Sequence, residues 1–167
     1  MPRISFLLSL IPLCAIPGNV LAQEPTSPEK KAEMIRLVDS LEAHPYGGNA
    51  DGSRKAVMEW LTDAPDVTVT VCSALLGDVE KLEGEKDDPG LLLQLMFAEA
   101  RFILQHPEQA QDEKAVHTAG VKGALAFYDA MKKERPDVKL PTIEKIAKSN
   151  ADGKLDGFIA TAIEKCN

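Results

Sequence analysis

Apolar residues recur with helical spacing along most of this chain. After Ser27–Pro28, a pair that suits the start of a helix, an apolar stripe continues to His44–Pro45. A second stripe begins at about Ser53 and stops before Pro65. Residues 46–52 between them are rich in glycine and asparagine, which favour turns. These patterns predict two helices joined by a loop.

The segment 91–105 is apolar on nearly every side of the predicted helix. Three of its polar residues, Gln94, Arg101 and Gln105, fall within about 40° of one another at 100° per residue, so we expect one narrow exposed stripe. A helix covered in this way is typical of the centre of a bundle. Asp88 is placed to cap this helix, and Pro89 is placed to be its first residue.

Three further helices are expected after His106–Pro107. The first extends from about 112 to 134 and carries Gly120 and Gly123 on its inner face. Glycine costs a helix roughly 1 kcal/mol relative to alanine, so the two glycines predict a close approach to the preceding helix. Shorter helices follow, from Pro141 to about Ser149 and over about 154–165.

The segment 65–82 fits two structures. Val67, Val69 and Val71 alternate with threonines, a pattern typical of a strand. Pro65 and the aspartates beside it favour a helix start instead, and the chain offers no convincing second strand to pair with the first. We therefore expect a helix over 65–82. A short strand at 66–72, at the edge of a sheet formed between two copies of the protein, is the alternative.

Together these elements predict an all-α fold of six or seven antiparallel helices, arranged as a bundle or a short helical stack. The chain has 167 residues, of which 44% are apolar and 27% charged. Such a length and composition are typical of one globular domain, which we place at 23–167.

The first 22 residues have the features of a secretory signal peptide. Arg3 supplies the positive start, an apolar stretch follows, and small or modest residues precede a cleavage site that we place after Ala22. The apolar stretch is shorter than the roughly 20 residues that cross a membrane, and Pro12 interrupts it. We expect a secreted or periplasmic protein without a membrane span.

The charge balance argues against partners that are themselves strongly anionic. Removal of residues 1–22 leaves 18 basic and 26 acidic residues, a net charge of -8. Nucleic acids and anionic membranes attract proteins that present an excess of Lys and Arg, and no strongly basic cluster is present here. We expect no nucleic-acid partner.

The same cleavage removes Cys14 and leaves Cys72 and Cys166. Two cysteines in an oxidising compartment most simply form one disulfide. The bridge would connect the middle of the chain to its C-terminus.

The clearest candidate for a metal site is the segment 150–156, which resembles the middle of an EF-hand calcium loop. Lys148 and Ile159 occupy the first and last ligand positions, where such a loop needs carboxylates. The string Asn-Ala-Asp-Gly also occurs at 49–52, again before a helix, which favours turn formation. We predict no metal site and no cofactor.

Four other residues are candidates for binding. Glu99 lies opposite the polar stripe of the central helix, so its carboxylate must be paired or protonated. His117 has Glu113 one helical turn away, but no further metal ligand clearly converges on it. Tyr46 and Trp60, with His44 and Pro45, would line a recognition surface around the glycine loop.

The sequence contains no known catalytic constellation. We therefore expect a non-catalytic protein-interaction module whose partner is another envelope or extracellular protein. One alternative is a carrier that holds an apolar small molecule between helices, suggested by the apolar surface of 91–104. A second is an enzyme that uses Glu99 or another carboxylate with His117.

Overall fold

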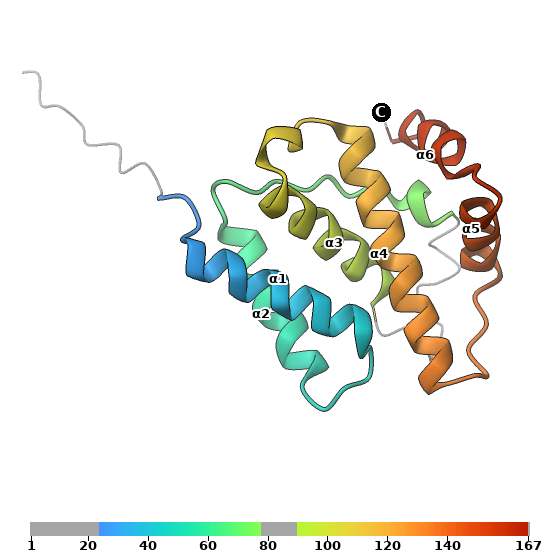
Figure 1. The fold of residues 1–167 in the computed structure, drawn as a ribbon, viewed down its shortest axis with the longest axis horizontal. Helices are drawn as coiled ribbons and strands as arrows, with labels where there is room; N and C mark the ends of the chain where they lie inside the picture. Colours follow the sequence, from blue (N-terminus) through green and yellow to red (C-terminus); the bar gives the residue numbers. More distant parts are fainter. Residues whose placement is uncertain (1–23, 78–89, 167) are drawn as a thin grey trace, which may run out of the picture.

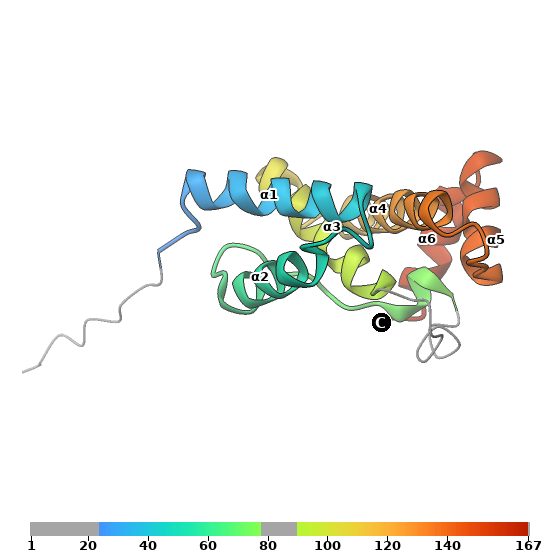
Figure 2. The same cartoon turned by 90° about the horizontal axis from the view of Figure 1, so that it is seen from below.

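The computed structural model describes residues 24–77 and 90–166. The predicted signal peptide therefore lies outside the described residues. Within these ranges the fold contains helices and no strand, as the all-α prediction requires. Six α-helices pack together, with α1 and α2 at one end, α5 and α6 at the other, and α3 and α4 between them (Figures 1 and 2).

The helices have the following bounds: α1 Pro28–Ala43, α2 Ala50–Asp63, α3 Leu91–Gln105, α4 Glu113–Glu134, α5 Pro141–Ala151 and α6 Leu155–Ile163. Two short 3₁₀ helices complete the described part, η1 at Ser73–Leu76 and η3 at Pro107–Gln109. Helix α2 begins three residues earlier than predicted, directly after Asn49.

Local capping explains where two of the long helices begin. The Ser27 hydroxyl accepts a hydrogen bond from the Lys30 backbone N–H at the start of α1. The Asp112 carboxylate does the same for the Ala115 N–H at the start of α4. Both caps satisfy an N–H that the helix itself cannot bond. The predicted cap Asp88 and first helical residue Pro89 lie outside the described residues.

The helix predicted over 65–82 is wrong for the residues that the structure describes. Residues 67–72 form an open connection that leads from the end of α2 to η1, and they belong to neither a helix nor a strand (Figure 1). The β-branched residues of this segment have low helix propensity. Only Ser73–Leu76 coils, into a single 3₁₀ turn. Residues 78–82 lie outside the described residues.

Helix α3 is the centre of the fold, as its apolar sequence predicts. It contributes Phe97 to a cluster with α1 and α2, and Leu91 and Leu95 to a larger cluster with α4, α5, α6 and η1. Ala100 and Ile103 form a third cluster with Val67 and Val116. One part of the prediction is wrong: Gln94, placed in the exposed polar stripe, is buried.

The predicted reason for the two glycines of α4 is confirmed. A Cβ atom on Gly120 would lie 2.6 Å from Cγ of Glu99, and one on Gly123 would overlap Cβ of Ala98. Both contacts are with α3, so the absence of side chains allows α3 and α4 to approach closely.

Tyr128 positions the connection to α5. Its hydroxyl accepts a hydrogen bond from the Leu140 N–H and donates one to the Glu144 carboxylate, each 3.0 Å long. Burial is the main cause of the raised pKa of Tyr128. Helix α5 is thereby attached to the inner face of α4.

Candidate functional site

The first candidate site is a buried pair of titratable side chains between α3 and α4. Nδ1 of His117 lies 2.7 Å from Oε1 of Glu99, a hydrogen-bond distance. The exposed fraction is 0% for Glu99 and 2% for His117. The structure thus brings together two residues that the sequence suggested separately.

Each member of the pair alters the proton affinity of the other. Burial raises the pKa of the Glu99 carboxyl, and the hydrogen bond and charge of His117 oppose that effect. The hydrogen bond to Glu99 raises the pKa of His117, with burial acting in the opposite direction. Glu113 makes a weaker contact, with its half-exposed carboxylate 3.8 Å from Nε2.

This geometry meets one requirement of the enzyme interpretation, because a carboxylate within hydrogen-bond reach of an imidazole can orient it as a base. Neither side chain, however, lines any of the three grooves described below, which lie around Trp60, Met58 and Tyr46. The observed contacts join α3 to α4, and Gly120 leaves the space that Glu99 occupies.

A second polar cluster, which no sequence pattern indicated, connects α1 to α3. The Arg101 guanidinium contacts Asp39 at 2.5 Å and Glu42 at 2.8 Å. Burial raises the pKa of Glu42, and Arg101 counteracts that rise. The two terminal nitrogens of the guanidinium thus contact two different carboxylates of α1, which connects α3 to α1. The arginine had been assigned to an exposed stripe, so the sequence carried no signal of this contact.

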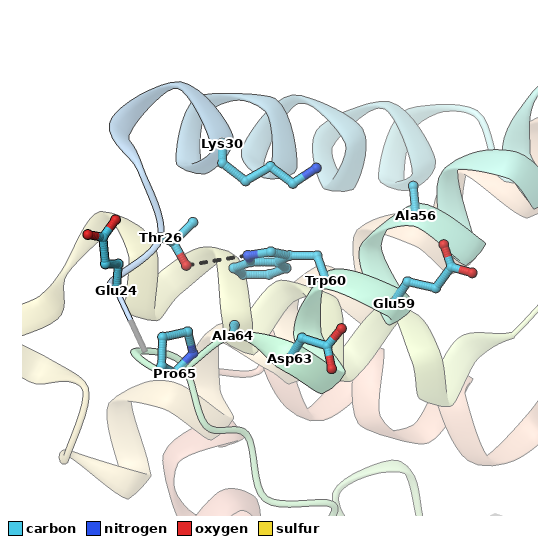
Figure 3. Close-up of a pocket in the computed structure, with 9 residues that line it drawn as sticks. All are labelled: Glu24, Thr26, Lys30, Ala56, Glu59, Trp60, Asp63, Ala64 and Pro65. Atoms are coloured by element: carbon cyan, nitrogen blue, oxygen red, sulfur yellow. Dashed lines mark hydrogen bonds between the residues drawn. The ribbon is translucent and has the colours of Figure 1, made fainter. Parts of the chain in front are cut away.

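The third candidate is an open groove of about 430 Å³ between the segment before α1, α1 itself and the end of α2. The indole of Trp60 lies in its middle (Figure 3). Lys30 and Ala56 lie on one side of the ring and Ala64 and Pro65 on the other. Trp60 is half-buried, because its inner part packs on two apolar clusters beneath the groove.

A chain of polar contacts fixes one wall of this groove. Nε1 of Trp60 donates to the Thr26 hydroxyl at 3.4 Å, and that hydroxyl donates to Asp66 at 2.6 Å. Asp66 is also paired with Lys31 at 3.1 Å. Burial disfavours the charged form of Asp66, but the bonds from Thr26 and Lys31 outweigh it and lower the pKa. These contacts join three segments along one wall of the groove.

Acidic groups dominate the rim of the groove. Glu24, Glu59 and Asp63 supply three carboxylates, and the cation among the lining residues is Lys30. Lys30 is paired with Glu33 at 3.0 Å. Among the described residues, Glu59 contacts Lys55 at 3.7 Å, a long distance between two largely exposed groups.

Tyr46 does not share this groove. It lies in the loop before α2, whereas Trp60 lies near the end of that helix. The Arg135 guanidinium sits 4.4 Å from the centre of the Tyr46 ring. Tyr46 lines a separate hollow of about 290 Å³ whose other lining residues include Pro45, Asp51 and Arg54, and His44 is the C-cap of α1. The two aromatic residues thus do not form one recognition surface.

Cys72 and Cys166 form a disulfide, with Cα atoms 5.6 Å apart. Cys72 is buried and Cys166 is exposed. The bridge joins the residue before η1 to the chain just after α6. It accounts for both cysteines of the described ranges.

The segment that resembles an EF-hand loop forms the turn between α5 and α6. Gly153 has a φ of 70°, Asp152 is paired with Lys148, and Asp156 is paired with Lys114. In the part of the chain that the structure describes, no group of three or more His, Cys, Asp or Glu side chains is placed to hold a metal ion. Nor does any helix there combine the length and apolarity needed to cross a membrane.

Comparison of the chain with protein-family models, with curated proteins and with solved structures finds no match.

Proposed function

We propose that this chain is a non-catalytic protein-interaction module of the cell envelope or the extracellular space. Its partner presents a basic segment, and a Lys or Arg side chain of that segment enters the Trp60 groove. The observation that carries the proposal is the groove itself, which combines an aromatic ring, a fixed wall and a rim with three carboxylates.

The chemistry of the groove favours a cation. An ammonium or guanidinium group over an indole gains roughly 0.5–2 kcal/mol, and Trp is the best aromatic partner for it. Glu24, Glu59 and Asp63 would add attraction at the rim. The net charge of the whole chain, -7, would also attract a basic partner before contact.

The surroundings of α3 support a binding role over a carrier role. The apolar surface that suggested a carrier is occupied by contacts with the other helices in three clusters. Location outside the cytoplasm is supported by the features of residues 1–22 and by the Cys72–Cys166 bridge.

The sole tryptophan of the chain provides a direct test. A set of extended peptides that carry Lys or Arg among neutral residues is titrated into the protein, and Trp60 emission is recorded. We expect at least one basic peptide to change the emission with saturation, and its glutamate-substituted counterpart to have no effect. Binding should weaken as salt is added, because the rim is exposed.

Charge reversal at the rim provides the matched comparison. Glu59→Lys should weaken binding at least tenfold, whereas Glu164→Lys, an equal charge change at the exposed end of α6, should leave it nearly unchanged. If basic and acidic peptides act alike, or if both variants weaken binding equally, the groove is not the binding site. If no peptide alters the emission, the proposal is wrong.

A further inference from the structure

A second surface lies on the open connection between α2 and η1. Residues 67–71 alternate valine and threonine, the β-branched residues that most favour extended backbone. They follow an open path along the bundle (Figure 1). Such a sequence is suited to a strand, but the described part of the chain supplies no strand to pair with it.

Among the described residues, the backbone of this segment finds no hydrogen-bond partner. Within residues 24–77 and 90–166, neither the N–H groups nor the carbonyls of residues 67–71 take part in a hydrogen bond. The neighbouring segments differ, because the Ala64 N–H bonds to Trp60 and the Leu75 N–H bonds to Cys72. An unpaired extended backbone at a surface is a template for another strand.

The side chains divide the segment into an attached part and an open part. Val67 is buried against Ala100, Ile103 and Val116, which holds the segment on the bundle. Thr68 and Thr70 are exposed, and Val71 keeps 54% of its surface exposed. Val71 and Met58 are the large apolar residues that remain exposed in the described part. Met58 lines a groove of about 330 Å³ beside Val67, Thr68 and Val69.

We propose that residues 67–71 pair with the same residues of a second copy of this chain, as two antiparallel strands related by a two-fold axis at Val69. The pattern Val-Thr-Val-Thr-Val reads the same in both directions, so this arrangement places Val67 opposite Val71 and Thr68 opposite Thr70. Like residues then meet on each face, and with Thr68 and Thr70 as the hydrogen-bonded pairs, the N–H and C=O groups of these alternate residues bond to the second backbone.

The distribution of charge also favours a second copy of the chain as the partner of residues 67–71. Two chains of net charge -7 repel one another over most of their surfaces, but residues 67–72 carry no charge. The nearest carboxylate in the sequence, Asp66, is paired with Lys31. The segment is therefore a place where two copies can approach without like charges facing each other. The interface is short, so we expect a dimer that dissociates on dilution.

Sedimentation velocity of the full chain with its disulfide intact, from about 1 µM to about 1 mM, measures the association. Val71→Lys places a cation in the proposed pair and should weaken dimerisation at least tenfold. Thr70→Pro should do the same, because it removes the N–H that Thr70 donates to the second copy in the proposed pair and that has no partner among the described residues of one chain. Ala126→Lys, on the exposed face of α4, and Thr70→Ala are the matched controls and should dimerise like the wild type.

Hydrogen exchange tests independently whether residues 67–71 form the dimer interface. The amides of 67–71 should exchange quickly in dilute protein and more slowly at high concentration, and this protection should be absent in Val71→Lys. A chain that remains monomeric up to about 1 mM overturns the proposal. So does a dimer that both segment variants retain, because that dimer would use another surface.

Discussion

Glu99 and His117 are buried in contact with each other, so the protonation of one depends on the other. An unfolded histidine loses its proton near pH 6.5, whereas folded His117 keeps it to higher pH because of the bond to Glu99. The native state therefore binds more protons than the unfolded state above about pH 6.5. The contribution of His117 to stability is complete below that pH and is lost as pH rises through the folded pKa. The raised pKa of Glu99, caused by burial, acts in the same direction above its unfolded value of 4.5.

The variant Glu99→Gln tests this dependence, because it removes the charge and keeps a polar group of the same size. We expect it to lower the free energy of unfolding by about 2–3 kcal/mol near pH 6 and by less near pH 9. Urea unfolding, followed by circular dichroism at several pH values, measures the difference.

Glu113→Gln is the matched control for this prediction, since it removes an exposed carboxylate from the other side of the same imidazole. Its effect should stay below about 1 kcal/mol. A Glu99→Gln effect that is constant between pH 5 and pH 9, or no larger than that of the control, would show that the pair is not a titrating contact.

At the scale of elements, the contact between α3 and α4 depends on two positions without side chains. Replacement of Gly120 by alanine would improve the helix propensity of α4 by roughly 1 kcal/mol. The new methyl group, however, would lie 2.6 Å from Cγ of Glu99 and 2.9 Å from its Oε1. Overpacking of a core costs about 1–3 kcal/mol, and here it would also disturb the pair with His117. The loss should exceed the gain.

We therefore predict that Gly120→Ala lowers the free energy of unfolding by about 1–2 kcal/mol. Gly157→Ala is the comparison, because a Cβ there meets nothing within 4 Å on the exposed face of α6. That variant should stabilise the protein by about 0.5–1 kcal/mol. Thermal and urea unfolding of the two variants should give shifts of opposite sign. Equal stabilisation by both would mean that α3 and α4 are not closely packed at Gly120.

The two glycines also show which parts of an element can be predicted from sequence. Glycine in an apolar helix face indicates close packing, and the periodicity of α3 indicates a central helix. Neither pattern indicates which residues of the two helices face one another. Glu99 and His117 were each recognised as unusual, but their contact spans 18 residues and depends on the register of α3 against α4. Gln94 was misassigned for the same reason, since its burial depends on where the neighbouring helices lie.

The connection 67–72 shows the opposite case, in which local rules conflict. Pro65 and the aspartates beside it are typical of a helix start, whereas the valines and threonines that follow disfavour a helix. Packing decides between them, because an open path allows Val67 to reach the cluster around Ile103. The described structure has neither a helix nor a strand at 67–72, and pairing between two copies stays a proposal that the dimerisation experiments test.

At the scale of the whole molecule, the disulfide joins two regions far apart in the sequence. It closes a loop of 94 residues between the start of η1 and the end of α6. Helix α6 also contributes Leu155 and Ile159 to the large apolar cluster, together with Leu75 and Leu76 of η1. The bridge therefore reinforces a contact that apolar packing already makes, and it restricts both the unfolded chain and partly opened states in which α6 separates from η1.

Reduction of this bridge should lower the free energy of unfolding by about 4–5 kcal/mol, the cost expected for a loop of this length when the native contacts persist. Cys166 is exposed, so a reductant can reach one sulfur without global unfolding. Urea unfolding with and without a thiol reductant measures the loss. The double variant Cys72→Ser/Cys166→Ser should have the same free energy of unfolding as the reduced protein, and the reductant should not change it.

Because η1 and α6 are the segments that the bridge joins, their amides should show the largest increase in hydrogen exchange after reduction. The amides of α3 and α4 should change least, since α3 packs against elements on every side. A loss spread evenly over all helices would mean that the bridge supports the whole fold cooperatively. Equal stability of the oxidised and reduced proteins would show that packing around Leu75 and Ile159 suffices to hold the C-terminal helices in place.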